Sequence, residues 1–197
     1  MVDAPSLRII ASADGTALLR IEPGTWPWNV SPGAKERPAA ATVFLYDANK
    51  KDYHFWKTFT LRNPISPATA IISNGGKWIA TFDDWDPSIG QGENVLVLYR
   101  ESGEFVKAWK LEDIFSAEEI AALQPREKES NKERPLTIGD FRRVWRSNDV
   151  SFITDSKGEA IWIPFSPDHR FIGALRVDLA SKTIRKIRGE KLESKSP

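Results

Sequence analysis

The residues best suited to chemistry lie in one short segment, 82–94, which is rich in carboxylates and glycine. Carboxylate oxygens clustered on such a loop suit Ca²⁺, which takes roughly six to eight oxygen ligands. Two carboxylates held roughly 5–9 Å apart can also hydrolyse a glycosidic bond. The spacing is not that of an EF-hand loop, and a solvated turn whose aspartates cap nearby amides is the simpler interpretation. The candidate metal ligands or acid–base groups are Asp83, Asp84, Asp86 and Glu93.

Tryptophans are the second group that can bind a ligand. Trp26 and Trp28 lie in a loop with two prolines and a glycine, and Trp85 lies in the acidic segment. An indole on a rigid loop can stack on a sugar ring or grip a peptide. The alternative is that these side chains fold back and seal one end of the protein. Three other tryptophans, Trp78, Trp109 and Trp162, fall on expected strands and are expected to pack in the core.

Composition excludes several kinds of site. The chain of 197 residues has no cysteine and two histidines, so disulfides, thiolate metal sites and cysteine nucleophiles are ruled out. Lysine and arginine number 28 against 27 acidic residues, so no overall charge attracts nucleic acid. No catalytic set is recognisable, and we assign no catalytic residue. Whether the chain is an enzyme stays open, with a non-enzyme preferred.

The elements that must position these residues are short strands separated by turns. Three stretches have a strand, a glycine turn at Gly15, Gly76 or Gly158, and a second strand. Each is followed by a second hairpin, so the chain predicts three units of four antiparallel strands. We expect a single all-β domain, 1–197, with these units at roughly 7–62, 69–111 and 150–188. The prediction treats the three glycines as equivalent corners of one repeated meander.

One short helix and one charged loop complete the expected elements. Ser116 and Glu119 have the spacing of a capping box, which predicts a helix near 117–123 that ends before Pro125. Residues 125–135 mix both signs of charge without periodicity, which is typical of a solvated loop.

The second unit resembles a known repeat. Ser73-Asn74-Gly75-Gly76-Lys77-Trp78, followed by the apolar run 95–99 and by Gly103-Glu104-Phe105-Val106, is similar to one blade of the WD-repeat-like bacterial β-propellers. The resemblance covers 69–111 well and the other two units loosely. It lacks the Gly-His and Trp-Asp signatures, and three blades are fewer than the roughly four to eight of closed propellers. It implies a propeller-like all-β fold, with a β-trefoil or a β-sandwich as alternatives.

These observations favour a non-enzymatic binding or scaffold module that recognises a protein or glycan through its tryptophan-bearing loops. The alternative is a carbohydrate-active hydrolase that uses the carboxylates of 83–93. We expect no cofactor apart from Ca²⁺, and self-association into a homo-oligomer is left open. No apolar run is long enough to span a membrane, and no leader is visible at the first residues. Location stays open, and we favour the periplasm or secretion over the cytoplasm.

Overall fold

The computed structural model describes residues 5–25, 36–85, 90–123, 145–147, 149–165 and 173–188. Within these ranges the chain is almost entirely β-structure, and it divides into two compact units, Met1–Lys110 and Leu111–Pro197. Each unit is described by itself. No helix in the described part is long and apolar enough to cross a membrane.

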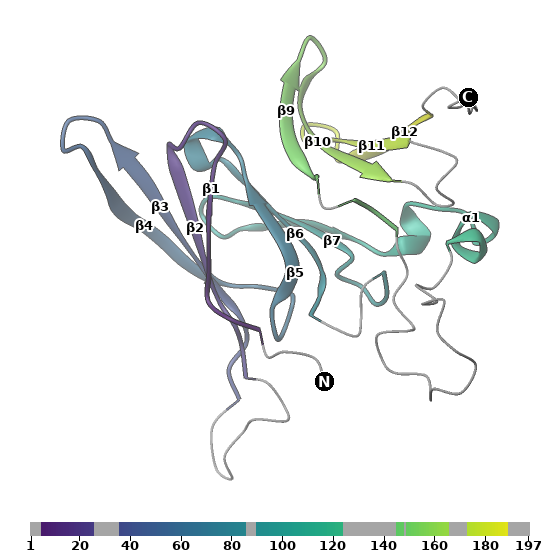
Figure 1. Ribbon diagram of the computed structural model, residues 1–197, viewed down its shortest axis with the longest axis horizontal. Helices are drawn as coiled ribbons and strands as arrows, with labels where there is room; N and C mark the ends of the chain where they lie inside the picture. The colour runs from purple at the N-terminus through teal and green to yellow at the C-terminus, as the bar shows by residue number, and fades with distance from the viewer. Residues whose placement is uncertain are drawn as a thin grey trace, which may run out of the picture. The chain divides into compact units, whose positions relative to one another are not determined.

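The first unit contains two four-stranded antiparallel meanders (Figure 1). Sheet I consists of β1 (Arg8–Ala11), β2 (Ala17–Glu22), β3 (Ala40–Asp47) and β4 (Asp52–Thr60). Sheet II consists of β5 (Pro67–Ile72), β6 (Trp78–Asp84), β7 (Leu96–Arg100) and β8 (Phe105–Trp109). In both sheets each strand pairs with the next along the chain. The first and last pairs of each sheet are joined by short turns, and the middle pairs, β2–β3 and β6–β7, by longer connections.

The second unit contains a helix and a third meander. Helix α1 (Ala117–Ala122) begins at the capping box of Ser116 and Glu119, in which each side chain accepts a hydrogen bond from the other residue's backbone amide. The predicted helix is therefore confirmed. Sheet III consists of β9 (Ser151–Asp155), β10 (Gly158–Phe165), β11 (Gly173–Asp178) and β12 (Thr183–Arg188).

Three four-stranded antiparallel meanders and one short α-helix in the described ranges confirm the predicted propeller-like all-β fold. The strands begin and end within a few residues of the expected units. The charged loop 125–135 lies outside the described residues, and the expectation of a single domain stays a prediction.

The turns of sheets I and II share the same hydrogen bonds. In sheet I the amide of Gly15 donates to the Ser12 carbonyl, and the amide of Ala17 donates to the Ser12 hydroxyl. In sheet II, 61 positions later, Gly76 and Trp78 make the same two bonds to Ser73. The predicted equivalence of Gly15 and Gly76 is confirmed.

Gly158 is different, and its expected equivalence is wrong. It pairs directly with Asp155 across a two-residue turn, which is too short to hold the serine-centred loop. The Asp155 carboxylate accepts the Lys157 amide there instead.

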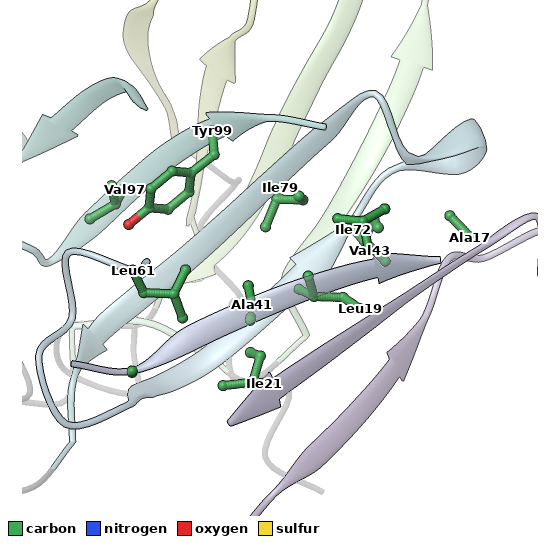
Figure 2. Close-up of a cluster of buried hydrophobic side chains, with 12 residues drawn as sticks. Ala17, Leu19, Ile21, Ala41, Val43, Leu61, Ile72, Ile79, Val97 and Tyr99 are labelled. Carbon is green, nitrogen blue, oxygen red and sulfur yellow. The ribbon is translucent and has the colours of Figure 1, made fainter. Parts of the chain in front are cut away.

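The core of the first unit lies between sheets I and II. One face of sheet I presents buried aliphatic side chains toward sheet II, and β2 alternates buried and half-buried residues accordingly. Figure 2 shows the side chains of the two sheets directed into one shared apolar layer. Its members include Leu19, Ile21, Ala41 and Val43 from sheet I and Ile72, Ile79, Val97 and Tyr99 from sheet II.

A glycine permits a close approach of the two sheets. Gly103, in the turn between β7 and β8, has a φ of 81° and lies against Phe59 of β4. A Cβ atom on Gly103 would come within 2.4 Å of both Cβ and Cγ of Phe59. Because these two atoms are attached close to the backbone of β4, a change of the Phe59 rotamer cannot move both of them away from the new Cβ.

Replacing Gly103 by alanine should therefore lower the free energy of unfolding by about 2–5 kcal/mol, the combined effect of a left-handed backbone and an overpacked contact. Gly75→Ala is the matched control. Gly75 also has a positive φ, 66°, but a Cβ there meets nothing within 4 Å. It should cost only about 1–2 kcal/mol. Urea denaturation of both variants measures the difference, and equal losses would contradict the proposed contact.

Candidate functional site

A buried amide organises a polar corner where β6 ends. Asn63, in the connection between β4 and β5, is fully buried. Its Nδ2 donates to Oδ1 of Asp84 at 3.0 Å and to the backbone carbonyl of Asp83 at 3.1 Å. Its Oδ1 accepts the Thr81 hydroxyl at 2.6 Å. Because a buried amide must satisfy both ends, this side chain fixes the position of the Asp84 carboxyl.

Asp83 turns the chain out of the sheet. Its φ is 54°, a left-handed conformation that aspartate tolerates better than most residues. Its carboxylate is fully buried, and Oδ1 accepts the Gly90 amide at 2.8 Å. Asp83 therefore ties the start of the acidic segment to Gly90 within it and does not present its carboxylate to solvent.

Asp84 has the environment of a reactive carboxyl. It is half-buried, and burial raises the pKa of its carboxyl above the ordinary value. The hydrogen bonds from Asn63 and Asn94 oppose this rise, and the nearby charge of Asp83 adds to it. Raised pKa values of this kind occur in groups that move protons and also in structural hydrogen-bond networks.

Tyr99 closes the buried side of the corner. Its hydroxyl oxygen accepts the Arg62 amide at 2.8 Å and is also hydrogen-bonded to Thr81. Burial raises the pKa of the Tyr99 phenol, so it stays neutral. Tyr99, Thr81, Asn63 and Asp84 thus form one continuous set of hydrogen bonds, and they leave Asp84 as its partly exposed member.

The remaining carboxylates do not join this network. Glu93 is exposed and forms an ion pair with Lys110 at 2.7 Å, which lowers the pKa of the Glu93 carboxyl. Asp86 lies outside the described residues. Among the residues that the structure does describe, no three histidine or acidic side chains are grouped to hold a metal ion. Calcium binding by Asp83, Asp84, Asp86 and Glu93 stays a prediction.

The tryptophans divide between core and surface. Trp26 and Trp28 lie outside the described residues. Trp85 is half-buried, its amide donates to the Ser66 carbonyl at 2.8 Å, and the Arg8 guanidinium lies 5.8 Å from its ring. The core positions expected for Trp78 and Trp109 are confirmed, and Trp162 is half-buried.

Sequence reasoning missed Asn63, Thr81 and Tyr99. Asn63 is 20 positions from Asp83, in a turn-like stretch that also contains two prolines. Thr81 and Tyr99 fall within apolar strands, where their hydroxyls give no local signal.

Comparison with known proteins gives limited results. No protein-family model matches the sequence, and neither does any curated protein. The periplasmic gluconolactonase PpgL of Pseudomonas aeruginosa is 12% identical, with a TM-score of 0.40 over 90% of this chain and 41% of its own. A putative 6-phosphogluconolactonase of Bacteroides fragilis is 14% identical, with a TM-score of 0.41 over 92% of this chain and 41% of its own. The chain therefore spans about two fifths of the length of each.

The main functional prediction is corrected at this point. A non-enzymatic module that recognises a protein or glycan through tryptophan-bearing loops is contradicted by these structures, since both are named as lactonases, which are enzymes. Ligand binding by Trp26, Trp28 and Trp85 stays a prediction. The alternative prediction, a hydrolase, fits the names of these two structures better.

The raised pKa of Asp84 gives a testable effect on stability. The folded state holds the Asp84 proton more tightly than the unfolded state does. The contribution of Asp84 to the free energy of unfolding therefore falls as pH rises through its unfolded-state and folded-state pKa values. The unfolded value is about 3.9. Asp84→Asn removes the cost of ionisation and keeps an oxygen that accepts from Asn63. It should raise the melting temperature at neutral pH, and the gain should vanish near about pH 3.

Thermal melts across this pH range measure the effect. Glu93→Gln is the control, because the pKa of Glu93 is lowered and its replacement should give no gain at neutral pH. A neutral-pH melting temperature of Asp84→Asn at or below that of the wild type would contradict the assignment.

The calcium prediction is tested separately by melting. Binding to the four carboxylates should raise the melting temperature in millimolar CaCl₂, and EDTA should reverse the rise. Magnesium is the control, since it prefers a smaller, octahedral site. An unchanged melting temperature would count against the site.

Proposed function

We propose that the protein is a hydrolase of a sugar-derived substrate, with Asp84 as the residue that moves the proton. The observation that carries the proposal is the state of this one carboxyl. It is half-buried, has a raised pKa and is fixed by the fully buried Asn63.

Asp84 suits the role of a general base. A raised pKa makes its ionised form a stronger base than that of an ordinary aspartate. Asp84 takes a proton from water as the water oxygen attacks an ester carbonyl carbon. The bond from that carbon to the ester oxygen then breaks, and the proton passes to the leaving oxygen, which gives a hydroxy acid.

The carboxylates favour an ester over a glycosidic bond. Glycosidic hydrolysis generally needs two carboxyl groups that flank the bond. Asp83 is fully buried and committed to the Gly90 amide, and Glu93 is paired with Lys110. Among the described residues of the acidic segment, Asp84 is the one whose carboxyl is partly accessible to solvent and has a raised pKa. One general base is sufficient for a cyclic sugar ester, a lactone, so this is the substrate class we propose.

Two further assignments accompany this proposal. The blade motif at 73–106 supports placing the chain among the WD-repeat-like bacterial propellers. A periplasmic or secreted location is kept as part of the proposal, and the absence of cysteine is compatible with it. The two similar lactonase structures agree with a sugar lactone, but the proposal depends on the environment of Asp84.

Glucono-1,5-lactone is the probe for the test, with proton release followed against a blank without protein. The wild type should accelerate ring opening, and Asp84→Asn should lower kcat by about 100-fold or more. Glu93→Gln should retain activity, because Glu93 is outside the network. Activity of Asp84→Asn equal to that of the wild type would overturn the role of Asp84. Turnover of nitrophenyl glycosides without turnover of the lactone would overturn the substrate class.

A further inference from the structure

One asparagine of the sequence is followed directly by glycine. It is Asn74, which begins the short 3₁₀ turn η2 (Asn74–Gly76) between β5 and β6. An asparagine in this position is chemically labile, because the backbone nitrogen of the next residue can attack its side-chain amide carbon. Glycine hinders that attack least, since it has no side chain and the widest backbone freedom. The pair Asn74-Gly75 is therefore where the sequence is most susceptible to spontaneous deamidation.

Burial does not protect this pair. Asn74 and Gly75 are both exposed, and a Cβ atom on Gly75 would meet nothing within 4 Å. Water therefore reaches both residues. Any protection from deamidation must come from the way in which their polar groups are held.

The turn of sheet I holds both reacting groups. The Gly75 amide, which contains the attacking nitrogen, donates to the Thr16 hydroxyl oxygen at 2.8 Å. Oδ1 of Asn74, on the carbon that would be attacked, accepts the Asp14 amide at 3.2 Å. The Thr16 hydroxyl donates onward to Oδ1 of Asp14 at 2.7 Å. The Thr16 backbone amide and hydroxyl both lower the pKa of the Asp14 carboxyl, so it remains an acceptor at neutral pH.

The turn η2 is also seated on sheet I. Its last residue, Gly76, is buried and has a φ of 74°. A Cβ atom on Gly76 would come within 2.7 Å of Cδ2 of Leu45 in β3 and within 3.3 Å of Cβ of Ala17 in β2. Separating Asn74 and Gly75 from their hydrogen-bond partners therefore requires local opening of the contact between the two sheets.

The deamidation reaction is incompatible with the closed contact. The Gly75 nitrogen bonds to Cγ of Asn74, its proton passes to the side-chain amide nitrogen, and that nitrogen leaves as ammonia. The succinimide nitrogen that results carries no hydrogen, so the bond to Thr16 is lost. Water then opens the ring at one of its two carbonyl carbons and gives aspartate or isoaspartate.

We propose that Asn74 is a spontaneous modification site that the turn of sheet I keeps unreactive, and that it deamidates when this end of the two sheets opens. Local opening requires less free energy than global unfolding in many parts of a protein. The rate of deamidation in the folded chain then reports how often the two turns separate. The proposal is independent of the hydrolase site at Asp84.

The test follows deamidation of the full chain during prolonged incubation at mildly alkaline pH, with and without guanidinium chloride, by peptide mass spectrometry. Asn74 should react about 10-fold or more slowly in the folded chain than in the unfolded chain, because two hydrogen bonds must first break. Asn49 is the internal control, since it is exposed but is followed by lysine, and it should react slowly in both states. Equal rates for Asn74 in the two states would overturn the proposal.

Thr16→Val and Thr16→Ser are the matched pair of variants. Valine keeps the shape of threonine but removes the oxygen that accepts the Gly75 amide, whereas serine keeps that oxygen. In the folded chain, Thr16→Val should speed deamidation of Asn74 by about 3-fold or more, and Thr16→Ser should keep the wild-type rate. Melting curves of both variants verify that each is folded at the incubation temperature. Equal rates in the two variants would overturn the protective role of Thr16, and the outcome for lactone hydrolysis has no bearing on this result.

Discussion

The contact between the core face of sheet I and sheet II supports every other feature of the first unit. A four-stranded meander with one apolar face gains stability by burying that face against a second sheet. Leu19, Val43 and Ile79 are completely removed from solvent in this layer. Its packing sets the path of β6 and of the 61–66 connection, which bring Asn63 next to Asp84.

The polar corner, formed by Asn63, Thr81, Asp83 and Asp84, lies at the edge of this apolar layer, where hydrogen bonds rather than apolar contacts hold the side chains. A buried amide such as Asn63 is destabilising unless every donor and acceptor is paired. Its bonds to Asp84, Asp83 and Thr81 satisfy it and at the same time restrict the Asp84 carboxyl. The raised pKa of Asp84 is a cost to folding, and the surrounding hydrogen bonds reduce that cost without removing it. The result is a carboxyl with a raised pKa that stays partly exposed at the edge of a rigid core.

Local chemistry explains which features could be predicted from the sequence. The turn at Gly76 and the capping box at Ser116 depend on residues a few positions apart, so their patterns are readable directly. The role of Asn63 depends on contacts 18 to 31 positions away, which no local pattern contains. The grouping of the carboxylates in the sequence was also misleading, because it suggested one shared environment. Asp83 is buried, Asp84 is half-buried and Glu93 is exposed. Gly158 resembled the other two glycines in its neighbours and differs because its turn is shorter.

The bulge in β4 allows one strand to serve two surfaces. Phe55 and Phe59 are four residues apart, an even spacing that places both on one side of a regular strand. Trp56 has no partner in β3, since Val43 pairs with Lys57 and Phe44 pairs with Phe55. This extra residue changes the phase, so that Phe59 packs in the interior and Phe55 faces outward. The length of β4 is therefore constrained as strictly as its composition, because losing a single residue at the bulge would exchange the inside and outside of half the strand.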